Sequence, residues 1–132
     1  MSSDETDELR RALLMLLPTL ALPGAATAQD ATKIQSGNYR VAFENDRLRV
    51  LDFISRPGMC VCGRGMHSHP PHLTITLTPG RTRVKLPDGT TSTKPDVPAG
   101  TVFWSEAETH DVENVSGRDM RAMLIELKAP RV

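Results

Sequence analysis

The sequence predicts a single all-β domain, built as a sandwich or a barrel. After about residue 37, short β-like runs recur at intervals of roughly 8 to 12 residues, which is typical of such folds. Residues that favour tight turns separate these runs, and none of the runs keeps a helical period. A chain of 132 residues is long enough for one hydrophobic core and too short for two.

The expected strands each bury one face, as antiparallel strands usually do. They are residues 39–44, 47–55, 59–66, 73–78, 81–86, 90–94, 101–105, 109–115 and 120–128. The turns between them contain Asn45-Asp46, Pro57-Gly58, Pro79-Gly80, Pro87-Asp88-Gly89, Pro98-Ala99-Gly100 and Ser116-Gly117, residues that supply turn dihedrals. In the run from Leu73, apolar residues alternate with threonines, which predicts that Leu73, Ile75 and Leu77 face the interior.

The N-terminal residues 1–28 resemble a secretory signal peptide. Arg10-Arg11 precedes an apolar run over 12–22, and the small residues Ala26-Thr27-Ala28 follow it. This order predicts a periplasmic or secreted protein, although acidic residues before Arg10 are unusual there. The alternatives are twin-arginine export or a buried amphipathic helix, and the run is too short for a stable membrane anchor. Residues 29–37 are then a linker, and residues 38–132 form the domain.

The charges are balanced, with sixteen basic and sixteen acidic residues and no long run of one sign. Neither nucleic acid nor a membrane is therefore an expected partner. The sequence also lacks a phosphate-binding P-loop and a nucleophile elbow. Phosphate-binding and nucleophile-elbow chemistries therefore find little support in the sequence.

Three of the four histidines lie within "MHSHPPHL", residues 66–73. His67 and His69 are two apart, so a strand would direct both rings to one side, where they could meet at one ion. Pro70-Pro71 breaks that strand, which leaves His72 open between a ligand and a loop residue near the mouth of a pocket. His110 follows the expected strand 101–105 after a short corner, and it could approach His67 and His69.

These histidines lie in two motifs that resemble those of the cupin superfamily. The first motif is read as His67-Ser68-His69, then Leu73 where the family usually has glutamate, then Gly80. The second runs from Gly100, through Glu106 in place of a common proline, to His110 and Asn114. Both motifs occur in order, about 40 residues apart, and the match covers roughly residues 38 to 128.

The resemblance implies a double-stranded β-helix, or jelly-roll barrel, with a metal ion near one open end. It implies His67, His69 and His110 as metal ligands, with His72 the least certain fourth ligand. Imidazole ligands suit a divalent transition metal, namely Fe, Zn, Ni, Cu, Mn or Co, better than Mg or Ca. The apolar wall around the metal is expected to contain Leu73, Ile75, Leu77, Val102, Trp104 and Met123 or Leu124.

The expected function is that of a mononuclear metalloenzyme acting on a small organic molecule. It would resemble three-histidine dioxygenases, or else a metal-dependent lyase or isomerase. The alternative is a binding module for a metal or small ligand without turnover. Homodimers that pair through sheet edges are expected by analogy with other small cupins.

Five further residues lie close to the histidines in the sequence. Glu106 is a weak candidate for a catalytic base, and Glu108 is a second, while solvent exposure on a corner is the commoner role for such carboxylates. Asn114 is expected to fix the strand after His110 through hydrogen bonds. Cys60 and Cys62 are expected to pack or form a disulfide rather than bind the metal.

Overall fold

The computed structural model describes residues 29–57 and 65–130. The predicted signal peptide and the two cysteines therefore lie outside the described residues. Among the residues described, no helix is long and apolar enough to cross a membrane.

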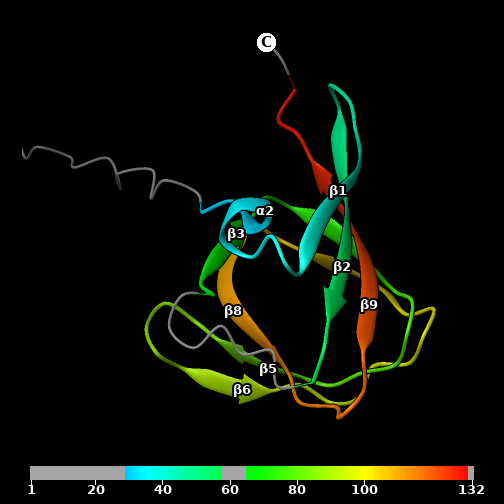
Figure 1. Cartoon of the computed structure of the whole chain (residues 1–132). Helices are drawn as coiled ribbons and strands as arrows, with labels where there is room; N and C mark the ends of the chain where they lie inside the picture. Colours follow the sequence, from blue (N-terminus) through cyan, green and yellow to red (C-terminus); the bar gives the residue numbers. More distant parts are fainter. Residues whose placement is uncertain (1–28, 58–64, 131–132) are drawn as a thin grey trace, which may run out of the picture.

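Two antiparallel sheets face each other and form an all-β double-stranded β-helix (Figure 1). The larger sheet has the strand order β1-β2-β9-β4-β7, and the smaller sheet has the order β3-β8-β5-β6. The strands are β1 (Tyr39–Glu44), β2 (Leu48–Ser55), β3 (His67–His69), β4 (His72–Thr76), β5 (Thr82–Lys85), β6 (Thr91–Thr93), β7 (Val102–Ser105), β8 (Glu108–Asn114) and β9 (Met120–Leu127).

Most of these strands match the predicted runs within about two residues, because the turn residues mark where each strand ends. At the turn before β7, for example, Gly100 has a φ of 81°, which favours glycine. The run 59–66 lies largely outside the described residues. In its place β3 begins at His67 and ends at His69, just before Pro70-Pro71.

One prediction about the strands is wrong, namely which face of β4 is the interior. His72, Thr74 and Thr76 are buried, whereas Leu73 and Ile75 lie on the outer face and are only half-buried. Register explains this, because Thr74 lies between Leu124 on β9 and Phe103 on β7, both of which point inward. Alternation shows that the two faces of a strand differ, but it does not show which of them is inside.

The hydrophobic core is small and lies between β1, β2 and β9. It consists of Ala31, Tyr39, Leu51, Phe53, Ala122 and Leu124. Leu51 is completely buried, and Tyr39 packs against Phe53 with ring centroids 4.9 Å apart. The core fills only part of the interior, which leaves the remainder for the polar residues described below.

A short helix, α2 (Ala31–Ile34), lies within residues 29–37, the segment expected to be a linker. Asp30 caps the helix by accepting a hydrogen bond from the Thr32 amide at 2.8 Å. The Ser68 amide donates to the Gln29 carbonyl at 2.8 Å, so this segment lies directly against β3. It therefore supports the strand that carries two of the histidines.

Candidate metal centre

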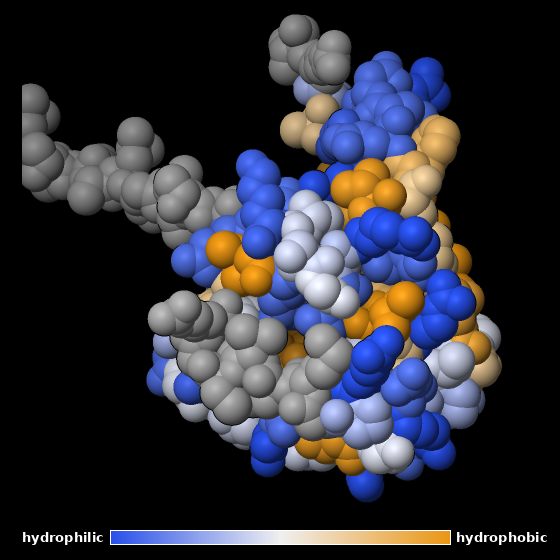
Figure 2. All heavy atoms as spheres, viewed as in Figure 1, coloured by the Kyte–Doolittle hydropathy of each residue, from blue (hydrophilic) through white to orange (hydrophobic). Residues whose placement is uncertain are grey.

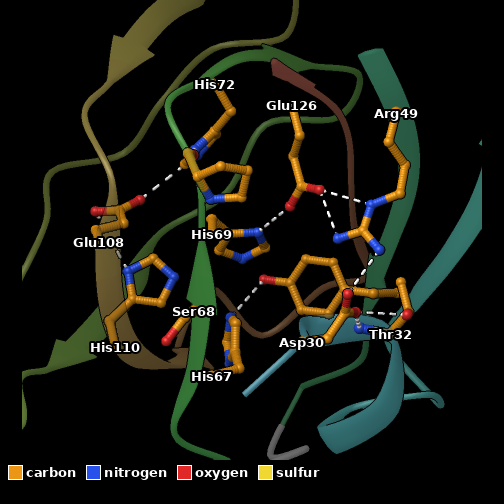
Figure 3. Close-up of polar contacts among 12 residues, drawn as sticks. Asp30, Thr32, Arg49, His67, Ser68, His69, His72, Glu108, His110 and Glu126 are labelled. Carbon is orange, nitrogen blue, oxygen red and sulfur yellow. Dashed lines mark hydrogen bonds and ion pairs between the residues drawn. The ribbon is translucent and has the colours of Figure 1, made fainter. Parts of the chain in front are cut away.

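His67, His69 and His110 meet in the interior where β3 pairs with β8 (Figure 3). His67 and His110 are direct cross-strand partners in this pair. The ring centroid of His67 lies 4.9 Å from that of His69 and 4.9 Å from that of His110. The centroids of His69 and His110 are 5.5 Å apart. One nitrogen from each ring lies within 4.8 Å of the others, roughly twice the metal–nitrogen distance of about 2.1 Å.

The Nδ1 atoms of His67 and His69 face acceptors on the outer side of the cluster. His67 Nδ1 donates to the Gly65 carbonyl at 2.6 Å, and His69 Nδ1 donates to Glu126 Oε1 at 2.7 Å. A neutral imidazole that donates from Nδ1 carries its lone pair on Nε2. His69 Nε2 is buried and has no hydrogen-bond partner among the described residues, as expected for an atom that binds a metal.

Burial keeps both rings neutral, which is the state that metal binding requires. It lowers the pKa of His67 to about 4 and also lowers the pKa of His69, although the Glu126 carboxylate opposes the second shift. The backbone at Gly65 is close-packed, because a methyl group there would collide with Gln35 and Asp111. The Gly65 carbonyl, which accepts the hydrogen bond from His67, is therefore held in place by packing as well as by that hydrogen bond.

A buried network of charged residues fixes the orientation of His69 (Figure 3). Glu126 on β9 is 1% exposed and accepts hydrogen bonds from His69 and from Arg49 Nε, the latter at 2.7 Å. Arg49 also donates to Asp30 at 2.7 Å. Burial opposes ionisation of Glu126, but the hydrogen bonds from His69 and Arg49 outweigh it and lower the pKa of this carboxyl group.

Tyr39 on β1 lies against the same two histidines. Its ring centroid is 5.0 Å from that of His67 and 5.2 Å from that of His69, and its hydroxyl lies 3.2 Å from His67 Nε2. Burial raises the pKa of Tyr39, so the phenol stays protonated and donates to this nitrogen. A metal on His67 Nε2 would replace that hydrogen bond.

His72 is fully buried but belongs to the edge of the cluster. Its Nδ1 donates to the Pro70 carbonyl at 2.8 Å, and its Nε2 lies 3.5 Å from Glu108 Oε1. The other oxygen of Glu108 lies 3.5 Å from His110 Nδ1. Burial opposes ionisation of Glu108, but His110 and His72 lower its pKa, so a carboxylate faces both rings.

A pocket of about 520 Å³ opens beside this edge of the cluster. His72, Glu108 and His110 form part of its wall. The remaining wall combines apolar side chains with hydroxyl groups, among them Phe103, Val112, Leu124, Thr74, Thr76 and Ser105. Of the wall predicted from the sequence only Leu124 is present. The predicted residues on β4, β7 and β9, namely Leu73, Ile75, Val102, Trp104 and Met123, lie on the outer face of the larger sheet, and Leu77, which follows β4, is 43% exposed.

The structure separates the two candidate bases. Glu106 accepts a hydrogen bond from Trp104 Nε1 at 2.7 Å on the exposed surface and is not among the described residues that line the pocket. Glu108 is the carboxylate that lies in the site. Asn114 has the expected structural role, because its amide donates to the carbonyls of Ser55 and Arg118 at 2.9 and 2.7 Å.

Sequence reasoning missed Tyr39, Arg49 and Glu126. Two of them carried a detectable signal, since Arg49 and Glu126 occupy inward positions of strands whose other inward residues are mostly apolar. A charge at such a position is rarely buried unless it is paired. Tyr39 gave no comparable signal, because a tyrosine on a strand is common in any core.

The neutral state of His67 predicts how stability depends on pH in the metal-free protein. Its pKa is about 4 when folded and 6.5 in the reference state, so the unfolded chain binds the proton first as pH falls. The free energy of unfolding should therefore be about 2 kcal/mol lower at pH 5 than at pH 7.5 from this group alone. Urea unfolding in the presence of a chelator measures this, and a His67→Gln variant should show a weaker dependence. Equal stability at the two pH values would contradict a buried neutral ring.

Comparison with protein-family models and with curated protein sequences gives no match. Solved structures do match. A cupin domain from Bordetella pertussis Tohama I is 26% identical, with a TM-score of 0.60 over 69% of this chain and 92% of that chain. An RmlC-like cupin family protein with a double-stranded β-helix fold, from Methanocaldococcus jannaschii, is 9% identical, with a TM-score of 0.51 over 67% of this chain and 77% of that chain.

Proposed function

We propose that this chain, a small domain of the cupin superfamily, binds one divalent transition metal ion through His67, His69 and His110. The observation that carries this proposal is the buried Nε2 of His69, which has no hydrogen-bond partner in residues 29–57 and 65–130 and lies beside two further imidazoles. An apolar or structural role for His69 would leave that atom unsatisfied at a considerable cost in free energy. A metal ion would satisfy it.

The residues around the histidines fit such an ion. The hydrogen bond from His69 to Glu126 is the carboxylate–histidine arrangement that commonly orients a metal ligand and makes it more basic. Three neutral nitrogen donors suit Fe, Zn, Ni, Cu, Mn or Co rather than Mg or Ca, which prefer oxygen ligands.

We further propose that the protein is an enzyme acting on a small organic molecule in the adjoining pocket. When bound, such an ion supplies Lewis acidity or redox chemistry, as in a dioxygenase, a lyase or an isomerase. Glu108 is placed to accept a proton from a ligand in the pocket, because it is ionised and lines the wall between His72 and His110. The apolar part of the wall limits access of water.

The wall also favours a ligand with a negative charge. Lys94 is the only lysine or arginine among the described residues that line the pocket, and no carboxylate of the described chain forms an ion pair with it. An organic acid of modest size could place its carboxylate at Lys94 and its apolar part along Val84, Val97 and Val112. The alternative function is a binding module that holds a metal or small ligand without turnover.

The test is to remove metal from the protein, reload it with each of the six metals in turn, and measure binding and turnover separately. Calorimetry should show one tightly bound ion per chain. Oxygen uptake and product formation are then followed with thiols, diketones and phenolic acids, each acid being paired with its uncharged amide. Turnover that favours the acids supports the enzyme. One tightly bound metal without turnover of any class favours the binding module, and no metal binding overturns both proposals.

A further inference from the structure

The side chain of Tyr39 lies where the histidine cluster meets the pocket. Tyr39 is the first residue of β1 and its only buried one, since the other five residues of the strand are exposed. Figure 2 shows hydrophilic residues over the tip of the β1–β2 hairpin, at the opposite end of β1 from Tyr39. The ring packs against His67 and also lines the pocket of about 520 Å³. Tyr39 is therefore placed to contact both the metal centre and a ligand in the pocket.

The Tyr39 hydroxyl has a single hydrogen-bond partner among the described residues. It donates to His67 Nε2 at 3.2 Å, and it is the donor because His67 Nδ1 already donates to the Gly65 carbonyl. Tyr39 is 4% exposed, and a buried tyrosine hydroxyl usually keeps a hydrogen-bond partner. The lone pair that accepts this hydrogen bond is the one that a metal ion needs at His67.

Metal binding would take that lone pair and leave the hydroxyl without its acceptor. A buried donor without an acceptor is costly, so a replacement is needed. Glu126 does not offer one, because one of its oxygens accepts from His69 and the other from Arg49. The oxygens of Glu108 face two other imidazoles. The pocket is the space beside the ring from which a new acceptor can come.

We propose that the Tyr39 hydroxyl donates a hydrogen bond to the ligand, and that it selects ligands that present an anionic acceptor beside the metal ion. This inference rests on the proposed metal centre and deepens it by naming a residue that determines specificity. A hydrogen bond to a charged acceptor is about twice as strong as one to a neutral acceptor, so an anion gains most. Lys94 lines the same pocket and favours the same charge.

The hydroxyl should affect metal binding and anion binding in opposite directions. Metal binding has to break the hydrogen bond at His67 Nε2, so the hydroxyl opposes it. An anion in the pocket restores a hydrogen bond to the hydroxyl, which therefore favours anion binding. A tyrosine that only supports the fold would not produce these opposite effects when its hydroxyl is removed.

Tyr39→Phe tests this, because it removes the hydroxyl and keeps the ring. Cobalt affinity of the full chain is measured by competition with a coloured chelator. Azide, a small anion, is then titrated into the cobalt-loaded protein and followed in the visible spectrum. The variant should bind cobalt at least as tightly as the wild type. It should bind azide about 10- to 100-fold more weakly, since it lacks a hydrogen bond to a charged acceptor.

Leu51→Val is the matched control for packing. Leu51 is completely buried in the same core as Tyr39, but it is not among the described residues that line the pocket. The substitution should lower the free energy of unfolding and leave the affinities for cobalt and azide close to those of the wild type. Circular dichroism verifies that each variant is folded.

A second measurement uses the wild-type chain alone. Tyr39 is the only tyrosine of the sequence, so ring-labelled tyrosine gives one set of signals in nuclear magnetic resonance spectra. Azide should shift the signal of the carbon that bears the hydroxyl in the zinc-loaded protein. An unshifted signal overturns the proposal, even where Tyr39→Phe does not fold.

The remaining outcomes separate this inference from the proposed metal centre. Equal azide affinity in the wild type and Tyr39→Phe overturns the inference and leaves the metal centre intact, as does a cobalt-loaded wild type that does not bind azide. Cobalt binding at least about 10-fold weaker in Tyr39→Phe also overturns the inference, because the hydroxyl oxygen would then be a ligand of the ion. A wild-type chain that binds no cobalt overturns the metal centre and this inference with it.

Discussion

The His110→Ala variant is expected to bind a divalent transition metal at least about 100-fold more weakly than the wild type, because it removes one of three nitrogen ligands. Its content of sheet should remain nearly unchanged. The His110 side chain is 11% exposed, and its ion-pair contact with Glu108 is a long one, at 3.5 Å. Metal titration by calorimetry and circular dichroism measure the two quantities on the same sample.

His72→Ala is the matched comparison for this variant. His72 is also an interior imidazole beside Glu108, but it is not one of the three histidines whose nitrogens lie within 4.8 Å of one another. Its removal should weaken metal binding less than about 10-fold. A loss as large as that of His110→Ala would make His72 a fourth ligand. Unchanged metal binding in His110→Ala would remove His110 from the site.

Glu126→Gln should weaken metal binding by about 10- to 100-fold without removing any ligand. The carboxylate accepts the Nδ1 hydrogen of His69 and so directs the lone pair of Nε2 toward the cluster. An amide can instead donate to Nδ1, which would favour the other tautomer and turn the lone pair away from the metal. Metal competition with a coloured chelator measures the change in affinity.

A second substitution at the same position separates orientation from stability. Glu126→Leu leaves the half-buried Arg49 with Asp30 as its remaining partner and removes the acceptor of the buried His69, so it should lower the free energy of unfolding by about 2–3 kcal/mol. Glu113→Gln is the control, since Glu113 is a glutamate of a surface ion pair on β8, outside the cluster. It should change neither metal affinity nor stability by much. Wild-type affinity in Glu126→Gln would show that the carboxylate does not orient His69.

Much of the fold was predictable because strand ends depend on local chemistry. Proline, glycine and asparagine favour the dihedrals of tight turns, so the strands from Tyr39 onward, with the exception of β3, begin and end close to their predicted positions. The pairing of His67 with His110 was predictable only through the resemblance to cupins. Nothing local to either strand specifies a partner about 40 residues away.

The remainder of the site depends on contacts between distant segments. Glu126 follows His69 by 57 residues, and Arg49 precedes Glu126 by 77, yet all three meet between β2, β3 and β9. Each is an isolated charge or imidazole in its own strand. Their function as a network exists only once the sheets have paired.

The sequence by itself determined where most of the strands lie, that His67 and His69 share a face, and that the faces of β4 differ in polarity. Only the tertiary structure decided which of those faces is inside. In β4 the polar face with His72, Thr74 and Thr76 is buried, and the apolar face with Leu73 and Ile75 points outward. The physical reason is that burial follows from sheet pairing, which here turns the polar face of β4 toward the histidine cluster and its pocket.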